Sequence, residues 1–143
     1  MPRSDFYVLP SPELDKREQF LYKLLEKVTA LGHQVYIRTA SEQHAATLDN
    51  RLWDYSPHGF IPHSLTAENL ASPVEIGYGD SMPKHRDVYL NLDLAIPDAA
   101  LEFDRVIEIV VQTPDILAAT RDNYRRYKTA GYDIHMNDMR PKT

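Results

Sequence analysis

Residues 5–9, DFYVL, and residues 35–37, VYI, are two apolar segments rich in aromatic and β-branched side chains. Such segments are typical of buried strands. Between them, residues 11–13, SPE, provide the serine cap, the proline and the acidic residue that begin a helix, and Gly32 is placed to end it. The order strand, helix, strand predicts two parallel strands joined by a right-handed crossover.

Two helices are predicted in the first part of the chain from the spacing of apolar residues. The stripe of the first helix comprises Leu14, Leu21, Leu24, Leu25, Val28 and Leu31. The second helix begins at Ser41, in a sequence that resembles a capping box. Its buried side comprises Ala45, Leu48, Leu52 and Trp53. The first 53 residues therefore alternate strand and helix twice, which indicates the α/β class.

Further strands are predicted where short apolar runs recur. These runs cover residues 74–78, 88–92 and 106–111. A short strand is also expected after the proline-rich loop at 55–63, and a last helix is expected to begin at residues 113–115, TPD. Gly131 is placed to end that helix before a final extended segment. We therefore predict one α/β domain over residues 1–143, with a mostly parallel sheet flanked by about three main helices.

The composition is that of an ordinary globular domain, because 43% of the 143 residues are hydrophobic and 26% are charged. The chain has no cysteine, which excludes disulfides and thiolate metal sites. No segment approaches the roughly 18 apolar residues of a membrane span, and the N-terminus lacks the apolar run of a signal peptide. We therefore expect no membrane association and a cytoplasmic location.

Charge is unevenly distributed along the chain. The net charge is −5, whereas residues 121–143 contain six basic and three acidic side chains. Affinity for long nucleic acids comes largely from cations that displace counterions from phosphates. We therefore expect no strong direct binding to nucleic acid, and an acidic protein partner fits the basic C-terminal region better.

A basic and aromatic cluster lies near the end of the last predicted helix. Arg121, Arg125 and Lys128 are spaced at i, i+4 and i+7, so a helix presents them on one face, with Tyr124 on its flank. Such a face can receive a carboxylate and an apolar group together. The alternative interpretation is a solvated last turn whose cations balance the negative end of the helix dipole.

Catalytic and cofactor signatures are mostly absent from the sequence. The turn after the first strand, residues 9–12, LPSP, has no glycine that would let a pyrophosphate approach the backbone, so no dinucleotide site is expected there. The six histidines are scattered, and only His58 and His63 form a close pair. With no cysteine nucleophile and no nucleophile elbow around a serine, we predict no catalytic residue, no metal site and no cofactor.

Seven blocks of sequence occur in the order, and at about the spacing, of a known family. They are FYVL at 6–9, GHQVYIR at 32–38, LDNRLW at 48–53, FIPH at 60–63, PVEI at 73–76, DVYLNL at 87–92 and the segment 121–132. In these blocks the chain resembles the chi subunit family of bacterial DNA polymerase III over nearly its whole length. The motifs LW, FIPH and YRRYKTAGY are together fairly specific.

The resemblance implies a Rossmann-like sheet and a non-enzymatic accessory subunit of the polymerase's clamp loader. It also implies two partners, the psi subunit on one side and the acidic C-terminal tail of single-stranded DNA-binding protein on another. The resemblance matches Arg121, Tyr124, Arg125 and Gly131 with tail-binding positions, and Lys128 and Tyr132 complete the predicted tail site. Leu117 replaces a basic residue expected about one turn before Arg121, which implies either a weaker affinity or a smaller electrostatic share of that affinity.

The resemblance places the psi contact on Trp53, Phe60, Pro62 and His63. Phe60 lies in a loop bounded by proline and glycine, where an aromatic side chain can serve as the exposed anchor of an interface. For Trp53 the alternative is core filling, because the helical stripe already turns it inward. Phe60 is therefore the preferred anchor.

Two other functions stay open at this point. The sheet architecture alone favours a small α/β nucleotide-binding protein or an enzyme of unknown substrate, since a fold does not determine a function. Direct binding of single strands by the aromatic and basic residues of the C-terminal region is disfavoured by the net negative charge.

Overall fold

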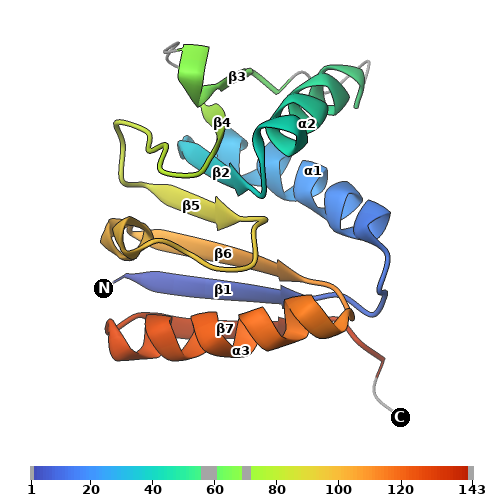
Figure 1. Ribbon diagram of the computed structural model, residues 1–143, viewed down its shortest axis with the longest axis vertical. Coiled ribbons are helices and arrows are strands. Elements are labelled where there is room, and N and C mark those ends of the chain that lie inside the picture. Colours follow the sequence, from blue (N-terminus) through green and yellow to red (C-terminus); the bar gives the residue numbers. More distant parts are fainter. Residues whose placement is uncertain (1, 56–60, 69–71, 142–143) are drawn as a thin grey trace.

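The computed structural model describes residues 2–55, 61–68 and 72–141, and these residues alternate strands and helices along the chain (Figure 1). The strands are β1 (Arg3–Val8), β2 (Val35–Thr39), β3 (His63–Leu65), β4 (Val74–Tyr78), β5 (Val88–Asn91), β6 (Arg105–Val110) and β7 (Asp133–Asp138). The helices are α1 (Leu14–Ala30), α2 (Glu42–Asp54) and α3 (Pro114–Thr129), with the short 3-10 helices η1 (Thr66–Glu68) and η2 (Asp98–Glu102). The predicted α/β class is confirmed.

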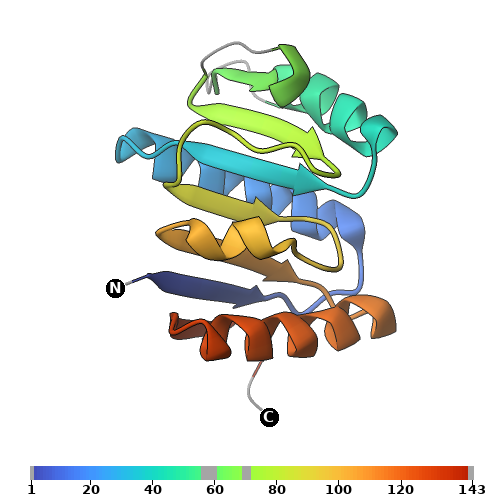
Figure 2. The same cartoon turned by 60° about the vertical axis from the view of Figure 1, so that its left-hand side comes forward.

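These strands form a single sheet in the order β3-β4-β2-β5-β6-β1-β7. Every pairing between neighbouring strands is parallel, so the sheet is more uniformly parallel than the sequence predicted. Parallel neighbours need long crossover connections, and helices provide most of them (Figure 2). The strands β3 and β7 are the two edges of the sheet and lie at its opposite ends (Figure 1).

Helices cover both faces of the sheet and enclose two apolar cores. On one face α1 and α2 pack through side chains such as Leu25 and Leu48. On the other face α3 and η2 pack through Tyr127 and Ala100 against Phe6 of β1. Because the central strands are buried on both faces, they read as continuous apolar runs in the sequence. Within the described residues, no helix combines the length and the apolar character that crossing a membrane requires.

The first and last helices end where the sequence predicts, but the first of them begins later. Gly32 and Gly131 follow α1 and α3 with φ angles of +86° and +88°, a conformation that glycine adopts without a Cβ clash. Ser41 caps α2, since its side chain accepts a hydrogen bond from the backbone N–H of His44. The predicted cap at Ser11 is wrong, because its hydroxyl accepts from the N–H of Glu13 in a turn that precedes α1.

Three residues assigned to buried helical stripes are instead exposed. Leu14 and Leu31, at the two ends of α1, are 55% and 68% exposed, and Trp53, in the last turn of α2, is 52% exposed. Apolar spacing predicts the angular position of a side chain around a helix, but not whether the sheet extends beneath the terminal turns. The other predicted stripe residues of both helices are buried.

Candidate functional site

The helix α3 presents one side to the sheet and the other to solvent, as its sequence predicts. The residues on the inner side are Ile116, Leu117, Tyr124 and Tyr127, which are buried or partly buried. Arg121, Arg125 and Lys128 are exposed on the outer side. The structure therefore brings the three predicted cations together on one exposed helix face.

These cations are available to a partner. The Arg125 side chain is 74% exposed, and its Nη1 lies 3.4 Å from Oδ1 of Asp122, which is equally exposed. An exposed pair of this kind contributes little, because solvent screens it. Among the described residues, neither Arg121 nor Lys128 forms an ion pair. An incoming carboxylate would therefore have to displace only the weak contact between Arg125 and Asp122.

Arg126, next in sequence to Arg125, is by contrast already used within the fold. Its Nη2 lies 2.6 Å from Oδ1 of Asp98, and its Nη1 donates to the backbone carbonyl of Ile96. These bonds tie α3 to the segment that contains η2. Of these two adjacent arginines, Arg125 is exposed to solvent, whereas Arg126 holds α3 in place.

The aromatic part of the predicted tail site divides into a surface residue and a core residue. Tyr124 is half-buried, and its ring centroid lies 5.8 Å from that of Phe6. Tyr132 is only 6% exposed, and its hydroxyl donates to the backbone carbonyl of Phe103 at 2.7 Å. Gly131 makes the turn that leads into it. The Tyr124 side chain can therefore contact a partner, whereas that of Tyr132 supports the turn from beneath.

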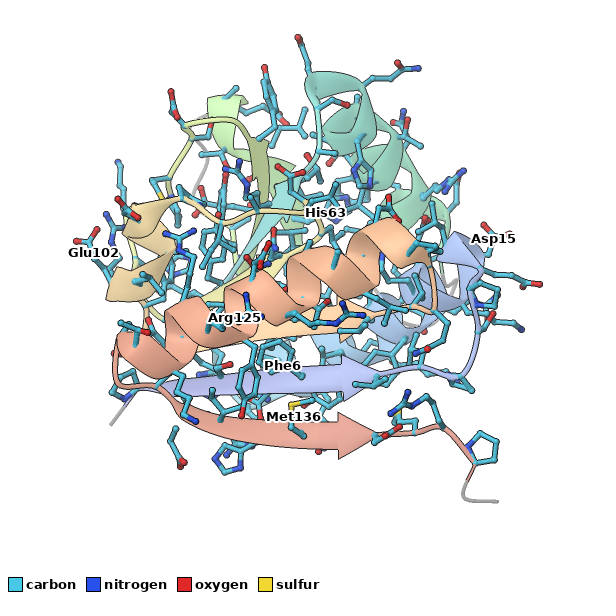
Figure 3. The ribbon with its side chains drawn as sticks, turned by 60° about the horizontal axis from the view of Figure 1, so that its bottom comes forward. Phe6, Asp15, His63, Glu102, Arg125 and Met136 are labelled. Carbon is cyan, nitrogen blue, oxygen red and sulfur yellow. The ribbon has the colours of Figure 1, made fainter. Side chains whose placement is uncertain are left out.

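Met136 on the edge strand β7 extends this surface and was not predicted from the sequence. Its register partner on β1 is Phe6, so both side chains point to the face that α3 covers (Figure 3). Met136 is 54% exposed. A weak signal was present, because Ile134 and Met136 alternate with polar residues. We call Arg121, Tyr124, Arg125, Lys128 and Met136 the α3 surface.

A buried carboxylate holds α3 on the sheet. Glu108 of β6 is 5% exposed and accepts hydrogen bonds from the hydroxyl of Tyr127 at 2.5 Å and from Nδ2 of Asn91 at 3.0 Å. Burial raises the pKa of Glu108 to about 7, although these hydrogen bonds act in the opposite direction. Sequence reasoning did not single out Glu108; the signal was one acidic residue inside the apolar run 106–111.

The predicted psi site lies at the other end of the sheet, around the C-terminal turn of α2. The His63 side chain is fully buried, with Nδ1 2.7 Å from the carbonyl oxygen of Ile61 and Nε2 3.0 Å from that of Asp49. The exposed ring of Trp53 packs on this imidazole, with 4.2 Å between ring centroids. Pro62 is exposed beside them. We call Trp53, Pro62 and His63 the α2 surface.

Within the α2 surface the three residues have distinct roles. Trp53 and Pro62 can touch a partner, and His63 fixes the ring of Trp53 from below. The fourth predicted residue, Phe60, lies outside the described residues. The expectation that Trp53 is buried is wrong, and its exposure makes it a candidate anchor in its own right.

Comparison with known proteins identifies the family of this chain. The family model for the DNA polymerase III chi subunit, HolC, matches residues 1–135. The DNA polymerase III subunit chi of Pseudomonas aeruginosa is 42% identical over 134 residues, which cover 94% of this chain and 94% of the relative. The proteins of the same name from Haemophilus influenzae and Escherichia coli K12 are 28% and 27% identical, and cover 95% and 94% of this chain and 96% and 97% of their own length.

Proposed function

This chain belongs to the DNA polymerase III chi subunit family, and we propose that it is a non-catalytic accessory subunit of the clamp loader that binds two partners at once. One partner is the acidic C-terminal tail of single-stranded DNA-binding protein, bound at the α3 surface. The other is the psi subunit, bound at the α2 surface. A protein with this role acts on the chromosome, so we expect it in the cytoplasm.

The observation that carries the proposal for the tail is the combination of exposed cations and apolar groups on the α3 surface. An acidic tail that ends in an aromatic residue needs cations for its carboxylates and an apolar wall for its ring. Arg121, Arg125 and Lys128 provide exposed cations, and guanidinium groups bind carboxylates with directed, charge-assisted hydrogen bonds. Tyr124 and the exposed Met136 provide apolar surface on the same side of the sheet.

Leu117 fits a tail site in which apolar contact has a larger share. The side chain packs partly buried against the core beneath α3, one turn before Arg121. A basic side chain at this position would add one more ion pair to an acidic tail. Because Leu117 is not basic, the affinity depends more on burial of the aromatic ring at the end of the tail and less on ion pairs.

The strand order supports simultaneous binding of both partners. The α2 surface includes the edge strand β3, and the α3 surface includes the opposite edge strand β7 (Figure 1). Six strand spacings of about 4.8 Å separate the two edges, so they lie roughly 29 Å apart. A short peptide at one edge would therefore not obstruct a protein at the other.

A capture experiment with two variants tests this arrangement. The immobilised chain is incubated with a lysate of its own organism, and captured proteins are identified by mass spectrometry. We expect Arg125→Glu to lose single-stranded DNA-binding protein but retain psi, and Trp53→Ala to show the reverse. Lys23→Glu, on the far side of the sheet, and Leu31→Ala, another exposed apolar residue, are the matched controls.

Two results would contradict the proposal. Loss of both partners in either variant would mean that the surfaces are not independent. Capture of neither partner by the unaltered chain would remove the assignment of partners while leaving the family membership intact.

A further inference from the structure

A cavity of about 270 Å³ lies between the first half of α1 and the helix α2. No residue of the α3 surface or the α2 surface lines it. Its volume is close to the lower limit of ligand cavities, which range from roughly 300 to 1,000 Å³. The cavity is therefore large enough for a small molecule and too small for a dinucleotide.

The cavity lies at the position in the fold where α/β proteins commonly bind ligands. After β2 the chain turns to α2 on one face of the sheet, and after β5 it turns to η2 on the other face. Because β2 and β5 are neighbours, a crevice opens at their carboxyl ends. His44, in the first turn of α2, and Leu92, just after β5, both line the cavity.

Arg17 brings to this cavity a positive charge that has no ion-pair partner among the described residues. Its guanidinium is partly buried and donates one hydrogen bond, at 3.3 Å, to the carbonyl oxygen of Leu92. It forms no ion pair with any carboxylate among the described residues. Burial lowers the pKa of Arg17 because the charged form has lost water, although more distant carboxylates act in the opposite direction. An anion in the cavity would restore the missing interaction.

Two further side chains determine the polarity of the lining. Nδ1 of His44 lies 3.1 Å from the backbone N–H of Ala40 and accepts from it, which places the ring proton on Nε2 as a donor. Burial, and then the charge of Arg17, lower the pKa of His44, which favours the neutral ring. Glu18 is already occupied, because Arg51 lies 2.7 Å from its Oε2 and Tyr22 donates to its Oε1.

The remaining lining is largely apolar, with one further carboxylate. Leu21 forms part of the inner wall, and Leu14, which is 55% exposed, lies at the mouth. Asp15, in the exposed first turn of α1 (Figure 3), is the further carboxylate of the lining. The turn 9–12 contains no glycine, so the backbone cannot wrap a pyrophosphate, and side chains must hold the ligand.

We propose that this cavity binds a small organic anion, namely a phosphate monoester or carboxylate with a short aliphatic group. Arg17 and the Nε2–H of His44 bind the anionic group. Leu14 and Leu21 contact the aliphatic part. The site is separate from both protein surfaces, so a ligand here would add a third binding function to the chain.

Nuclear magnetic resonance titrations of the whole chain with butyl phosphate, butyrate and butylammonium test the site. We expect saturable shifts of backbone amide signals in residues 14–21, 44–51 and at Leu92 with at least one of the two anions and not with butylammonium. Arg17→Gln should weaken that binding by about tenfold or more, because it removes a charge-assisted donor. Lys16→Gln removes the same charge from the neighbouring exposed position, and should change the affinity by less than about twofold.

Several outcomes would overturn the proposal. They are the absence of saturable shifts with either anion at millimolar concentration, equal effects of Arg17→Gln and Lys16→Gln, binding of butylammonium as strong as that of the anions, and shifts that map elsewhere. If Arg17→Gln fails to fold, the map of shifted amides in the unaltered chain decides the question. Comparison of the two anions shows whether phosphate or carboxylate is preferred.

Discussion

The two edges of the sheet present different chemistry to a partner. At the β7 edge, the α3 surface offers exposed cations beside partly buried apolar groups. At the β3 edge, the α2 surface offers one exposed indole that packs on a buried imidazole, whose nitrogens both contact backbone carbonyls. The first edge suits a flexible acidic segment, and the second suits an apolar anchor.

This difference predicts different kinds of binding at the two edges. Interactions with exposed cations are screened by salt and exchange quickly. Burial of an aromatic anchor depends little on salt and mainly lowers the dissociation rate. Under the proposed function, the chain would therefore hold psi for long periods while it captures and releases the acidic tail.

The largest expected effect concerns the pH dependence of stability, because α3 rests on Glu108, a buried carboxylate of raised pKa. Burial also raises the pKa of Asp49 beside the α2 surface, but that side chain is partly exposed. The pKa of Glu108 is about 7 in the folded protein, against an ordinary 4.5. Between these values the folded state binds more protons than the unfolded state, so the contribution of Glu108 is present at low pH and lost as pH rises through about 7. We expect a loss of about 3 kcal/mol.

Urea unfolding of the unaltered chain and of Glu108→Gln, measured from about pH 5 to pH 8, checks this expectation. The histidines His44 and His85 have lowered pKa values and act with the opposite sign, so the difference between the two proteins is the relevant quantity. The free energy of unfolding of Glu108→Gln, minus that of the unaltered chain, should increase steadily as pH rises. A constant difference would show that Glu108 does not titrate in this range.

The second effect concerns the anchor at the β3 edge. We expect Trp53→Ala to weaken psi binding by about 30-fold or more, since truncation of a central indole typically costs at least about 2 kcal/mol. The free energy of unfolding should change little, because the side chain is 52% exposed. Surface plasmon resonance and urea unfolding measure the two quantities, with Leu31→Ala as the control. A large loss of stability with unchanged binding would identify Trp53 as a structural residue.

The contrast between the edges also shows what the sequence could and could not predict. The fold was predictable, because apolar periods of two and 3.6 are local properties of the strands and helices that they specify. The cations of α3 were predictable for the same reason. The exposure of Trp53 and the burial of Tyr132 were not, because each depends on which distant strand or loop lies next to the side chain.

Glu108 and Met136 illustrate the same limit. The role of Glu108 depends on Tyr127 and Asn91, which reach it from another helix and another strand. Met136 joins the α3 surface through its register with Phe6, more than a hundred residues earlier in the chain. Pairings of this kind leave only a weak pattern in one sequence.

The third effect concerns the apolar share of tail binding at the β7 edge. Removal of the final phenylalanine from a peptide ending in Asp-Asp-Asp-Ile-Pro-Phe should weaken binding by more than about tenfold, because the ring would lose its contact with the α3 surface. A peptide with the final residue changed to tyrosine should retain most of the affinity. Fluorescence anisotropy compares the three peptides. Equal affinities would reduce the α3 surface to a generic basic patch.

The smallest effect is the salt dependence that separates the two edges. An increase in ionic strength from about 0.05 M to 0.5 M should weaken tail binding by about threefold to fivefold, because exposed ion pairs are screened over a few ångströms at high salt. Binding of psi should change by much less. Parallel titrations at both salt concentrations check this difference. Equal salt dependence at both edges would remove the distinction between them.

The most direct test of the α3 surface is calorimetric titration of the acidic peptide into the unaltered chain, Arg125→Glu and Lys23→Glu. The unaltered chain should bind with micromolar-range affinity, on the order of −8 kcal/mol. Arg125→Glu should weaken binding by about tenfold or more, because a cation is replaced by a carboxylate that repels the acidic peptide. Lys23→Glu, which has the same change of charge on the far side of the sheet, should leave the affinity nearly unchanged. Equal losses in the two variants would contradict a specific tail site on α3.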